Sequence, residues 1–276
     1  APLYLSRAQL KEGEARLADL MKAEQADPSW RAGMALLNYY IAESNWDKVV
    51  ETGKKYIQKY PDNYYIGLKY ANGLCETRQY GSCISLLSKM QVLPNEGSYA
   101  GRAVYRAANL YQAMDQFSKH RYDAALKSIK ASEEWPENLG VGKPYDDQID
   151  KRLEDYLEAK VYEKKGETAK AQTLLDKVSS HPTSTRNFES AHLLTALALR
   201  DTGKQAEADK LVASWKKDFP ESKPAQWCAA VYHGNMDQAR ELLSSRYASN
   251  ETTPWETGYR DTNFDLITRL FSGVPK

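Results

Sequence analysis

The sequence predicts an all-α fold, a right-handed α-solenoid built from helix-turn-helix repeats. The first observation is a template that occurs six times: a turn residue, two or three mostly polar residues, and then a small or β-branched residue that opens an apolar-periodic stretch. The turn residues lie 31 to 46 positions apart, at Ser44, Arg78, His120, Gly166, Gly203 and Gly234. Such spacing is typical of stacked helix pairs, in which each pair buries its apolar face against the next.

Proline supplies the second observation. Five prolines lie 11 or 12 residues after the small residue of their template, at Pro61, Pro94, Pro136, Pro182 and Pro220. Because proline cannot continue a helix and disfavours the α conformation of the residue before it, each of them marks the end of a second helix. Pro28 extends the series backwards. It predicts a partial N-terminal helix pair in residues 1–29, with helices over 3–10 and 15–25.

The third observation is a small residue where the two helices of a pair should cross. If the small residue of the template is position 20 of a repeat, position 8 should also be small. It is alanine in four repeats, Ala71, Ala113, Ala159 and Ala196, and is replaced by Leu37 and Trp227 in two. Alternating β-branched residues and hairpin turns are scarce, so strands are not expected. We therefore expect about six repeats over residues 30–246.

Two segments interrupt the period. Residues 134–147 are rich in glycine and proline and predict an inserted loop. We expect this loop to pack on the helices as a plug through Trp135, Leu139, Val141 and Tyr145, and the alternative is a contact surface for another domain. Residues 247–276 predict an irregular segment followed by a capping helix over 264–271.

Composition excludes several classes of function. The 276 residues carry 38 Lys and Arg against 37 Asp and Glu, so a net charge of +1 gives no field that would attract nucleic acid. No apolar run approaches the length of a membrane span. Three cysteines without a CxxC pair do not form a disulfide framework, and Cys83 is expected to be a buried thiol, with a disulfide or a metal site shared with Cys75 as the alternative. The chain begins with Ala1-Pro2 and has no initiator Met, so we expect a preceding segment to have been removed.

The repeats resemble those of the tetratricopeptide-repeat family over almost the whole chain. The loop that reads Trp-Pro-Glu-Asn-Leu-Gly-Val-Gly-Lys-Pro-Tyr-Asp, residues 135–146, and the Arg-Leu-Glu-Asp-Tyr-Leu that follows at 152–157 give a narrower resemblance. They look like the C-terminal repeat region of large bacterial proteins, common in gut Bacteroidetes, whose N-terminal domain of unknown function is similar to galactose mutarotase. That resemblance implies a bacterial protein, cytoplasmic or periplasmic, and carries no catalytic residue to this chain.

The tetratricopeptide resemblance also implies a concave groove lined by the first helix of each pair. The candidate groove residues are Asn38, Tyr65, Asn72, Arg102, Arg106, Tyr156 and Lys160. Asparagine amides can pair with a peptide backbone, and tyrosine and arginine are favoured at interfaces. The alternative is that these side chains only solvate the groove. The carboxylate clamp of chaperone-binding relatives is absent, because only Asn38 of its residues is present.

Other candidate sites have simpler explanations. Gly140-Val141-Gly142-Lys143 is not a phosphate loop, because Pro144 stands where Ser or Thr should hold magnesium. The four histidines lack metal-binding spacing, and we expect no metal and no cofactor. The acidic pairs at 133–134 and 146–147 could act as an acid and a base on a sugar, but nothing in the sequence opposes them across a site.

The leading hypothesis is therefore a non-catalytic scaffold that binds a protein or peptide ligand, with its own removed N-terminal domain as one possible partner. The second is a docking module of a larger carbohydrate-active protein. The third is an α-toroid enzyme that acts on carbohydrate, with Trp135, Trp215 and Trp255 as sugar platforms.

Overall fold

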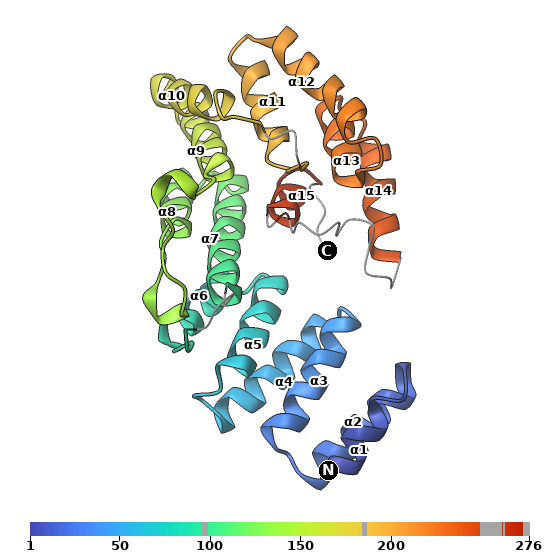
Figure 1. Cartoon of the computed structure of the whole chain (residues 1–276). Coiled ribbons are helices and arrows are strands. Elements are labelled where there is room, and N and C mark those ends of the chain that lie inside the picture. Colours follow the sequence, from blue (N-terminus) through green and yellow to red (C-terminus); the bar gives the residue numbers. More distant parts are fainter. Residues whose placement is uncertain (95–98, 184–186, 249–260, 262, 273–276) are drawn as a thin grey trace. The chain divides into compact units, whose positions relative to one another are not determined.

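The computed structural model describes residues 1–94, 99–183, 187–248, 261 and 263–272. Over these ranges the chain forms 15 α-helices, two short 3-10 helices and no strand (Figure 1). Consecutive helices pack against each other in pairs along the sequence. The prediction of an all-α chain of packed helix pairs is thus confirmed.

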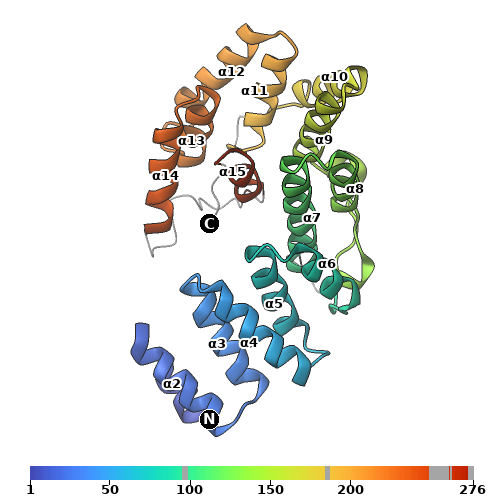
Figure 2. The same cartoon turned by 180° about the vertical axis from the view of Figure 1, so that it is seen from behind.

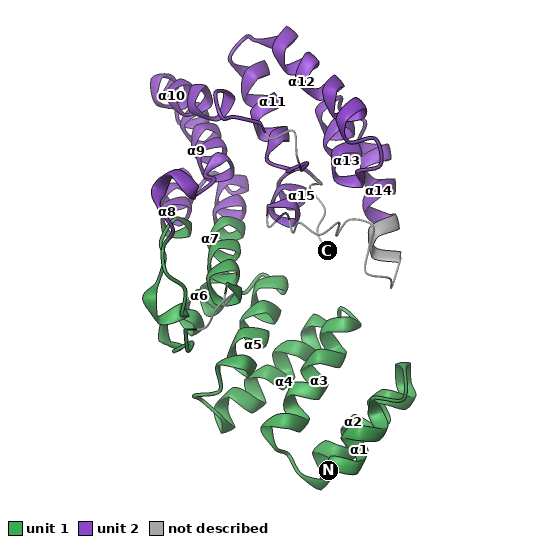
Figure 3. Ribbon diagram, viewed as in Figure 1, with its two compact units in different colours: residues 1–112, 131–143 green, residues 113–130, 144–276 purple. Residues whose placement is uncertain are grey.

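The chain divides into two compact units, coloured separately in Figure 3. Unit 1 consists of residues 1–112 and 131–143, and unit 2 of residues 113–130 and 144–276. The units divide two helices between them, α7 (Ala100–Ser118) and α8 (Tyr122–Ser132). Each unit is described separately below.

Unit 1 begins with three helix pairs. Its helices before α7 are α1 (Pro2–Ala8), α2 (Gly13–Ala26), α3 (Trp30–Ala42), α4 (Trp46–Lys59), α5 (Tyr64–Glu76) and α6 (Tyr80–Lys89). The first pair matches the predicted helices over 3–10 and 15–25. Glycines let the later helices approach closely: a Cβ on Gly33 of α3 would lie 2.5 Å from the Tyr56 ring of α4, and one on Gly53 would lie 2.7 Å from Tyr70 of α5.

Unit 2 continues the pairs after α8. Its helices are α9 (Arg152–Lys165), α10 (Thr168–Ser179), α11 (His192–Asp201), α12 (Gln205–Asp218), α13 (Lys223–Tyr232), α14 (Met236–Ala248) and α15 (Phe264–Ser272). The helix α15 occurs where the sequence predicts a capping helix over 264–271. Most of the predicted irregular segment, residues 249–260, lies outside the described residues, and α14 extends through 247 and 248.

All six predicted turn residues have a left-handed backbone, with φ between +51° and +81°. In every case the N–H of the following residue donates to the carbonyl oxygen five positions before it, at 2.8 to 2.9 Å, as in Asn45 to Tyr40 and Lys204 to Leu199. The turn residue itself donates three positions back, at 3.0 to 3.1 Å. These two bonds define a Schellman motif, which satisfies the last carbonyl groups of the first helix.

The small residue of each template is buried at the helix crossing. The six residues, Val49, Cys83, Ala125, Ala171, Ala208 and Ala239, are at most 2% exposed. The thiol of Cys83 donates to the carbonyl of Ala71, the position-8 residue of the same repeat, at 3.2 Å. Cys83 is therefore the buried thiol that the sequence predicts, and it forms no disulfide with Cys75.

The inserted loop of residues 134–143 packs against α6 and α7 within unit 1. The amide of Asn138 donates to the carbonyls of Leu87 and Met90, at 2.9 and 2.7 Å, and the N–H of Val92 donates to the carbonyl of Asn138 at 2.8 Å. The side chain of Leu139 is fully buried, and a Cβ on Gly101 would lie 3.4 Å from it. Through these contacts the loop connects the end of α6 to the start of α7.

The expectation of a docked loop is confirmed for Leu139 and is wrong for Tyr145. Trp135 and Val141 are half-buried, whereas Tyr145 is 79% exposed. The packed part of the loop ends before Gly142 and Lys143, which are both exposed, and Tyr145 lies beyond this point. The plug is thus shorter than the sequence predicts.

The role of the loop as a plug can be tested by truncating its buried leucine. Leu139→Ala should lower the free energy of unfolding by about 2 to 4 kcal/mol, because it leaves a cavity between α6 and α7. Tyr145→Ala in the exposed part of the loop is the matched control and should change the stability by less than about 0.5 kcal/mol. Urea unfolding followed by circular dichroism measures both. A Leu139→Ala curve that overlays the parent would contradict the plug.

Candidate functional site

Three of the candidate groove residues lie together on the first helices of unit 1. Asn38 of α3 and Asn72 of α5 occupy the same repeat position, and Tyr65 lies seven residues before Asn72 on the same face of α5. α3 and α5 contact each other and are neighbours in Figures 1 and 2. Asn38 is exposed, Tyr65 is 54% exposed and Asn72 is half-buried. We call these three residues the α3–α5 surface.

The tyrosine of the α3–α5 surface is part of an aromatic pair. The ring centroids of Tyr64 and Tyr65 lie 4.2 Å apart. Burial and a hydrogen bond would both hinder ionisation, and the bond to Tyr65 is the larger cause of the raised pKa of Tyr64. The Tyr64 phenol therefore stays neutral at physiological pH, and the exposed Tyr65 presents an apolar ring with a hydroxyl that can bond to a ligand.

The two candidate arginines have other surroundings. Arg102 of α7 is only 6% exposed, its guanidinium lies 4.6 Å from the ring centroid of Trp135, and its Nη2 donates to the carbonyl of Ser132 at 2.7 Å. These contacts fix the start of the inserted loop, so the Arg102 side chain stabilises the fold. Arg106, one turn later, is half-buried. The burial of Arg102 argues against its predicted place in a groove.

Tyr156 and Lys160, the two candidates in unit 2, also make internal contacts. Tyr156 is 5% exposed, and burial together with the charge of Asp201 raises its pKa far above the usual value. The ammonium of Lys160 lies 2.6 Å from Asp201 of α11 and 5.2 Å from the Tyr156 ring centroid. The two side chains therefore join α9 to α11. The position of Lys160 within its repeat cannot predict this link between helices, because Asp201 lies 41 residues later in the sequence.

Unit 2 has a surface that the groove prediction did not include. The helix α15 lies beside α11 and α13 in both views of the chain. Its Phe264 ring meets the ring of Trp227 on α13 edge to face, with centroids 5.4 Å apart. Leu266 and Ile267 are 5% and 0% exposed. The α11–α13 surface, which we define by Ser190 and Trp227, therefore already holds the apolar face of one helix.

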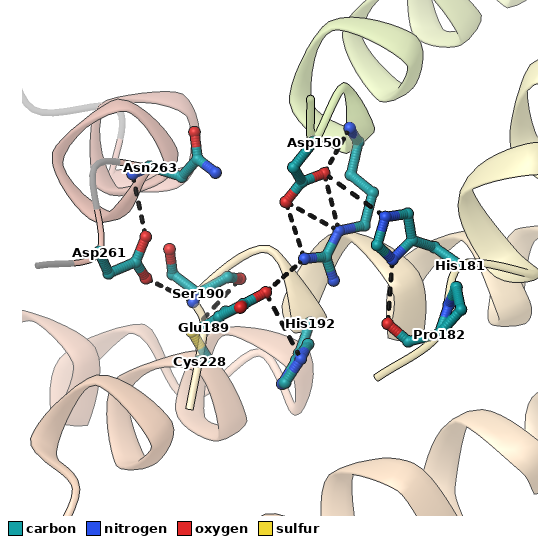
Figure 4. Close-up of polar contacts among 10 residues, drawn as sticks. Asp150, His181, Pro182, Glu189, Ser190, His192, Cys228, Asp261 and Asn263 are labelled. Atoms are coloured by element: carbon teal, nitrogen blue, oxygen red, sulfur yellow. Dashed lines mark hydrogen bonds and ion pairs between the residues drawn. The ribbon is translucent and has the colours of Figure 1, made fainter. Parts of the chain in front are cut away.

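A carboxylate fixes the start of α15 on this surface (Figure 4). Oδ2 of Asp261 accepts a hydrogen bond from the backbone N–H of Ser190 at 2.5 Å, just before α11, and Oδ1 accepts one from the N–H of Asn263 at 2.9 Å. One side chain thus satisfies N–H groups at the starts of two helices. A negative charge is favoured at both, because the helix dipole is positive at the N-terminus.

The residue before Ser190 belongs to a buried polar cluster at the start of α9. Arg152 is 2% exposed, and its guanidinium binds Asp150 at 2.8 Å and Glu189 at 2.7 Å. Burial alone would raise the pKa of Asp150, but the hydrogen bonds and charge of Arg152 outweigh it and lower that pKa. The cluster links α9 to the segment that leads into α11 (Figure 4).

His192 completes the cluster as a buried neutral group. It is 1% exposed, and its Nε2 lies 3.9 Å from Glu189, beyond hydrogen-bond distance. Burial, followed by repulsion from Arg152, lowers the pKa of His192 to about 4. The charged form is therefore disfavoured in the folded state.

Most of the tryptophan and glutamate side chains proposed for carbohydrate chemistry are buried or bonded within the fold. Trp215 is 2% exposed and packs edge to face on Phe188, with centroids 5.4 Å apart, so it offers no open platform. One face of Trp135 is covered by Arg102. Glu134 accepts a hydrogen bond from the Tyr105 hydroxyl at 3.2 Å. Trp255 lies outside the described residues.

A hollow of about 480 Å³ adjoins the inserted loop. It is lined by Glu133, Glu134, Trp135, Glu137, Val141, Gly142 and Lys143. Its carboxylates all come from one short stretch of chain, Glu133 to Glu137, whereas the acid and base of a glycosidase flank the bond that is cleaved. The hollow therefore gives no support to an acid–base mechanism.

Comparisons with known proteins add no identity. The chain matches no family model, and no curated protein is significantly similar to it. Within the described ranges no three His, Cys, Asp or Glu side chains are grouped to hold a metal ion. None of the helices found there is long and apolar enough to cross a bilayer.

The buried histidine predicts a pH-dependent stability. Because the pKa of His192 is about 6.5 when unfolded and about 4 when folded, the unfolded state binds more protons between these values. The free energy of unfolding should therefore fall by about 3 kcal/mol as the pH falls from 6.5 to 4. His192→Leu should abolish this loss.

Chemical unfolding at a series of pH values measures the effect. His233→Gln on the exposed end of α13 is the control, and it should keep the loss seen in the parent. An unchanged slope in His192→Leu would show that other groups cause the acid sensitivity.

Proposed function

We propose that this chain is a non-catalytic interaction scaffold, a right-handed α-solenoid of tetratricopeptide-like repeats that binds a peptide or a neighbouring domain on its first helices. The observation that carries the proposal is the packing of α15 on the α11–α13 surface. Phe264, Leu266 and Ile267 are buried where α15 meets the first helices α11 and α13. Full burial of each such side chain stabilises by about 1.5 to 3 kcal/mol. The first helices of this array can therefore accept an amphipathic helix.

The α3–α5 surface is the part of unit 1 that best suits a ligand. Asn38 and Asn72 repeat at equivalent positions on neighbouring helices, so their amides can pair with successive groups of an extended or helical backbone. Tyr65 adds a large ring that loses little conformational entropy on binding. Amides beside an exposed tyrosine favour recognition of a polypeptide over catalysis.

The two carbohydrate hypotheses receive less support. Docking within a larger carbohydrate-active protein would use the same surfaces and differs only in the partner, which would belong to the same polypeptide. A toroidal enzyme would need open aromatic platforms and opposed carboxylates. The burial of Trp215 and the covered face of Trp135 weigh against such platforms.

Peptide display on the full purified chain tests the proposal. A library of random 12- to 16-residue peptides should yield ligands with micromolar dissociation constants. Tyr65→Ala and Asn72→Ala should each weaken those ligands by about tenfold, the effect of losing one good contact. Tyr145→Ala, which removes an even more exposed tyrosine elsewhere, should leave the affinity unchanged. Ligands that ignore both α5 substitutions, or a display that yields no ligand, would contradict the α3–α5 surface.

A further inference from the structure

We infer that the α11–α13 surface is a second recognition site, specific for an amphipathic helix that begins with a carboxylate, and that α15 is its internal occupant. The inference rests on the proposed function and adds the chemical class of the partner. The partner would be a helical segment of another protein with the pattern of α15: an acidic residue followed at +3, +5 and +6 by large apolar residues. It would compete directly with α15.

The carboxylate requirement follows from the hydrogen bonds of Asp261. The N–H of Ser190, just before α11, donates to Asp261 at 2.5 Å. Ser190 itself is fully buried, so this N–H would lose water without gaining a partner if the acceptor were absent. A ligand that replaces α15 must therefore supply an acceptor, and a carboxylate at a helix N-terminus is the strongest one.

The apolar requirement follows from the ring of Trp227. That ring is itself completely buried and packs edge to face with Phe264. Ile267, one turn later on the same face of α15, is 0% exposed, while Asp265 between them is exposed. The surface thus selects a helix that presents aromatic and branched side chains.

The short length of α15 makes it replaceable. It has only 9 residues, and Leu270 and Phe271 in its last turn remain half-buried. Helices of this length are not stable alone, so α15 holds its shape through the surface on which it lies. Elements of this kind open at low free energy.

The test uses the full chain and a fluorescein-labelled peptide that reproduces residues 261–272. Ile267→Asp places a charge against the α11–α13 surface and should release α15 without touching the surface itself. Fluorescence anisotropy should then show micromolar binding of the peptide, and at least tenfold weaker binding to the parent, in which α15 competes. Leu3→Asp is the matched control, because it makes the same change at a side chain that is 86% exposed. It should behave like the parent.

The peptide carries its own controls. A peptide with Asp261→Asn should bind the Ile267→Asp chain about tenfold less tightly, and a peptide with Ile267→Asp should not bind. Equal binding to the parent and the variant would place the peptide elsewhere and overturn the inference. A folded variant that binds no peptide would do the same, and so would a variant that fails to fold, because α15 would then be an obligatory part of the core.

The two proposals fail separately. Loss of display ligands from the α3–α5 surface would not affect binding of the α15 peptide to unit 2. A negative result with the α15 peptide would leave the display ligands and their dependence on Tyr65 and Asn72 unchanged.

Discussion

A left-handed residue between the two helices of each pair is the constraint on which the rest of the array depends. It ends the first helix with two backbone hydrogen bonds and sets the direction of the second. Three of the six turns use glycine, which adopts this conformation without strain. Ser44, Arg78 and His120 do so at a cost of about 1 to 2 kcal/mol each. That cost is offset because each turn brings a small residue into the buried helix crossing that follows.

Much of the fold could be predicted because its signals are local. A turn residue and a small residue five positions later recur in all six repeats, and a proline follows the second helix in five of them; each acts on its own neighbours in the chain. The burial of Leu139 was predictable for a similar reason, since a loop rich in apolar residues gains from packing. The prediction that Tyr145 is docked was wrong, because the point at which the loop leaves the helices depends on contacts with α6 and α7.

The candidate sites were predicted less well because they depend on residues distant in the sequence. Position within a repeat places Asn38, Tyr65 and Asn72 on one face of the first helices, and their role in binding stays a prediction. Arg102, chosen one turn before the regular positions, is buried by Trp135 of the inserted loop, 33 residues later. The hydrogen bond that fixes α15 joins Ser190 to Asp261, 71 positions apart in the sequence. Its only sequence signal is the amphipathic pattern of residues 264–271, which predicts a capping helix but not the surface beneath it.

The central claim is that the first helices of the pairs form the binding face. Hydrogen–deuterium exchange of the full chain, with and without a saturating display-selected peptide, tests it most directly. The account predicts that the peptide slows exchange in α3 and α5 and leaves the second helices α4 and α6 and the inserted loop unchanged. Slower exchange confined to α4, α6 or residues 134–143 would contradict it, and would move the binding face to the other side of the array.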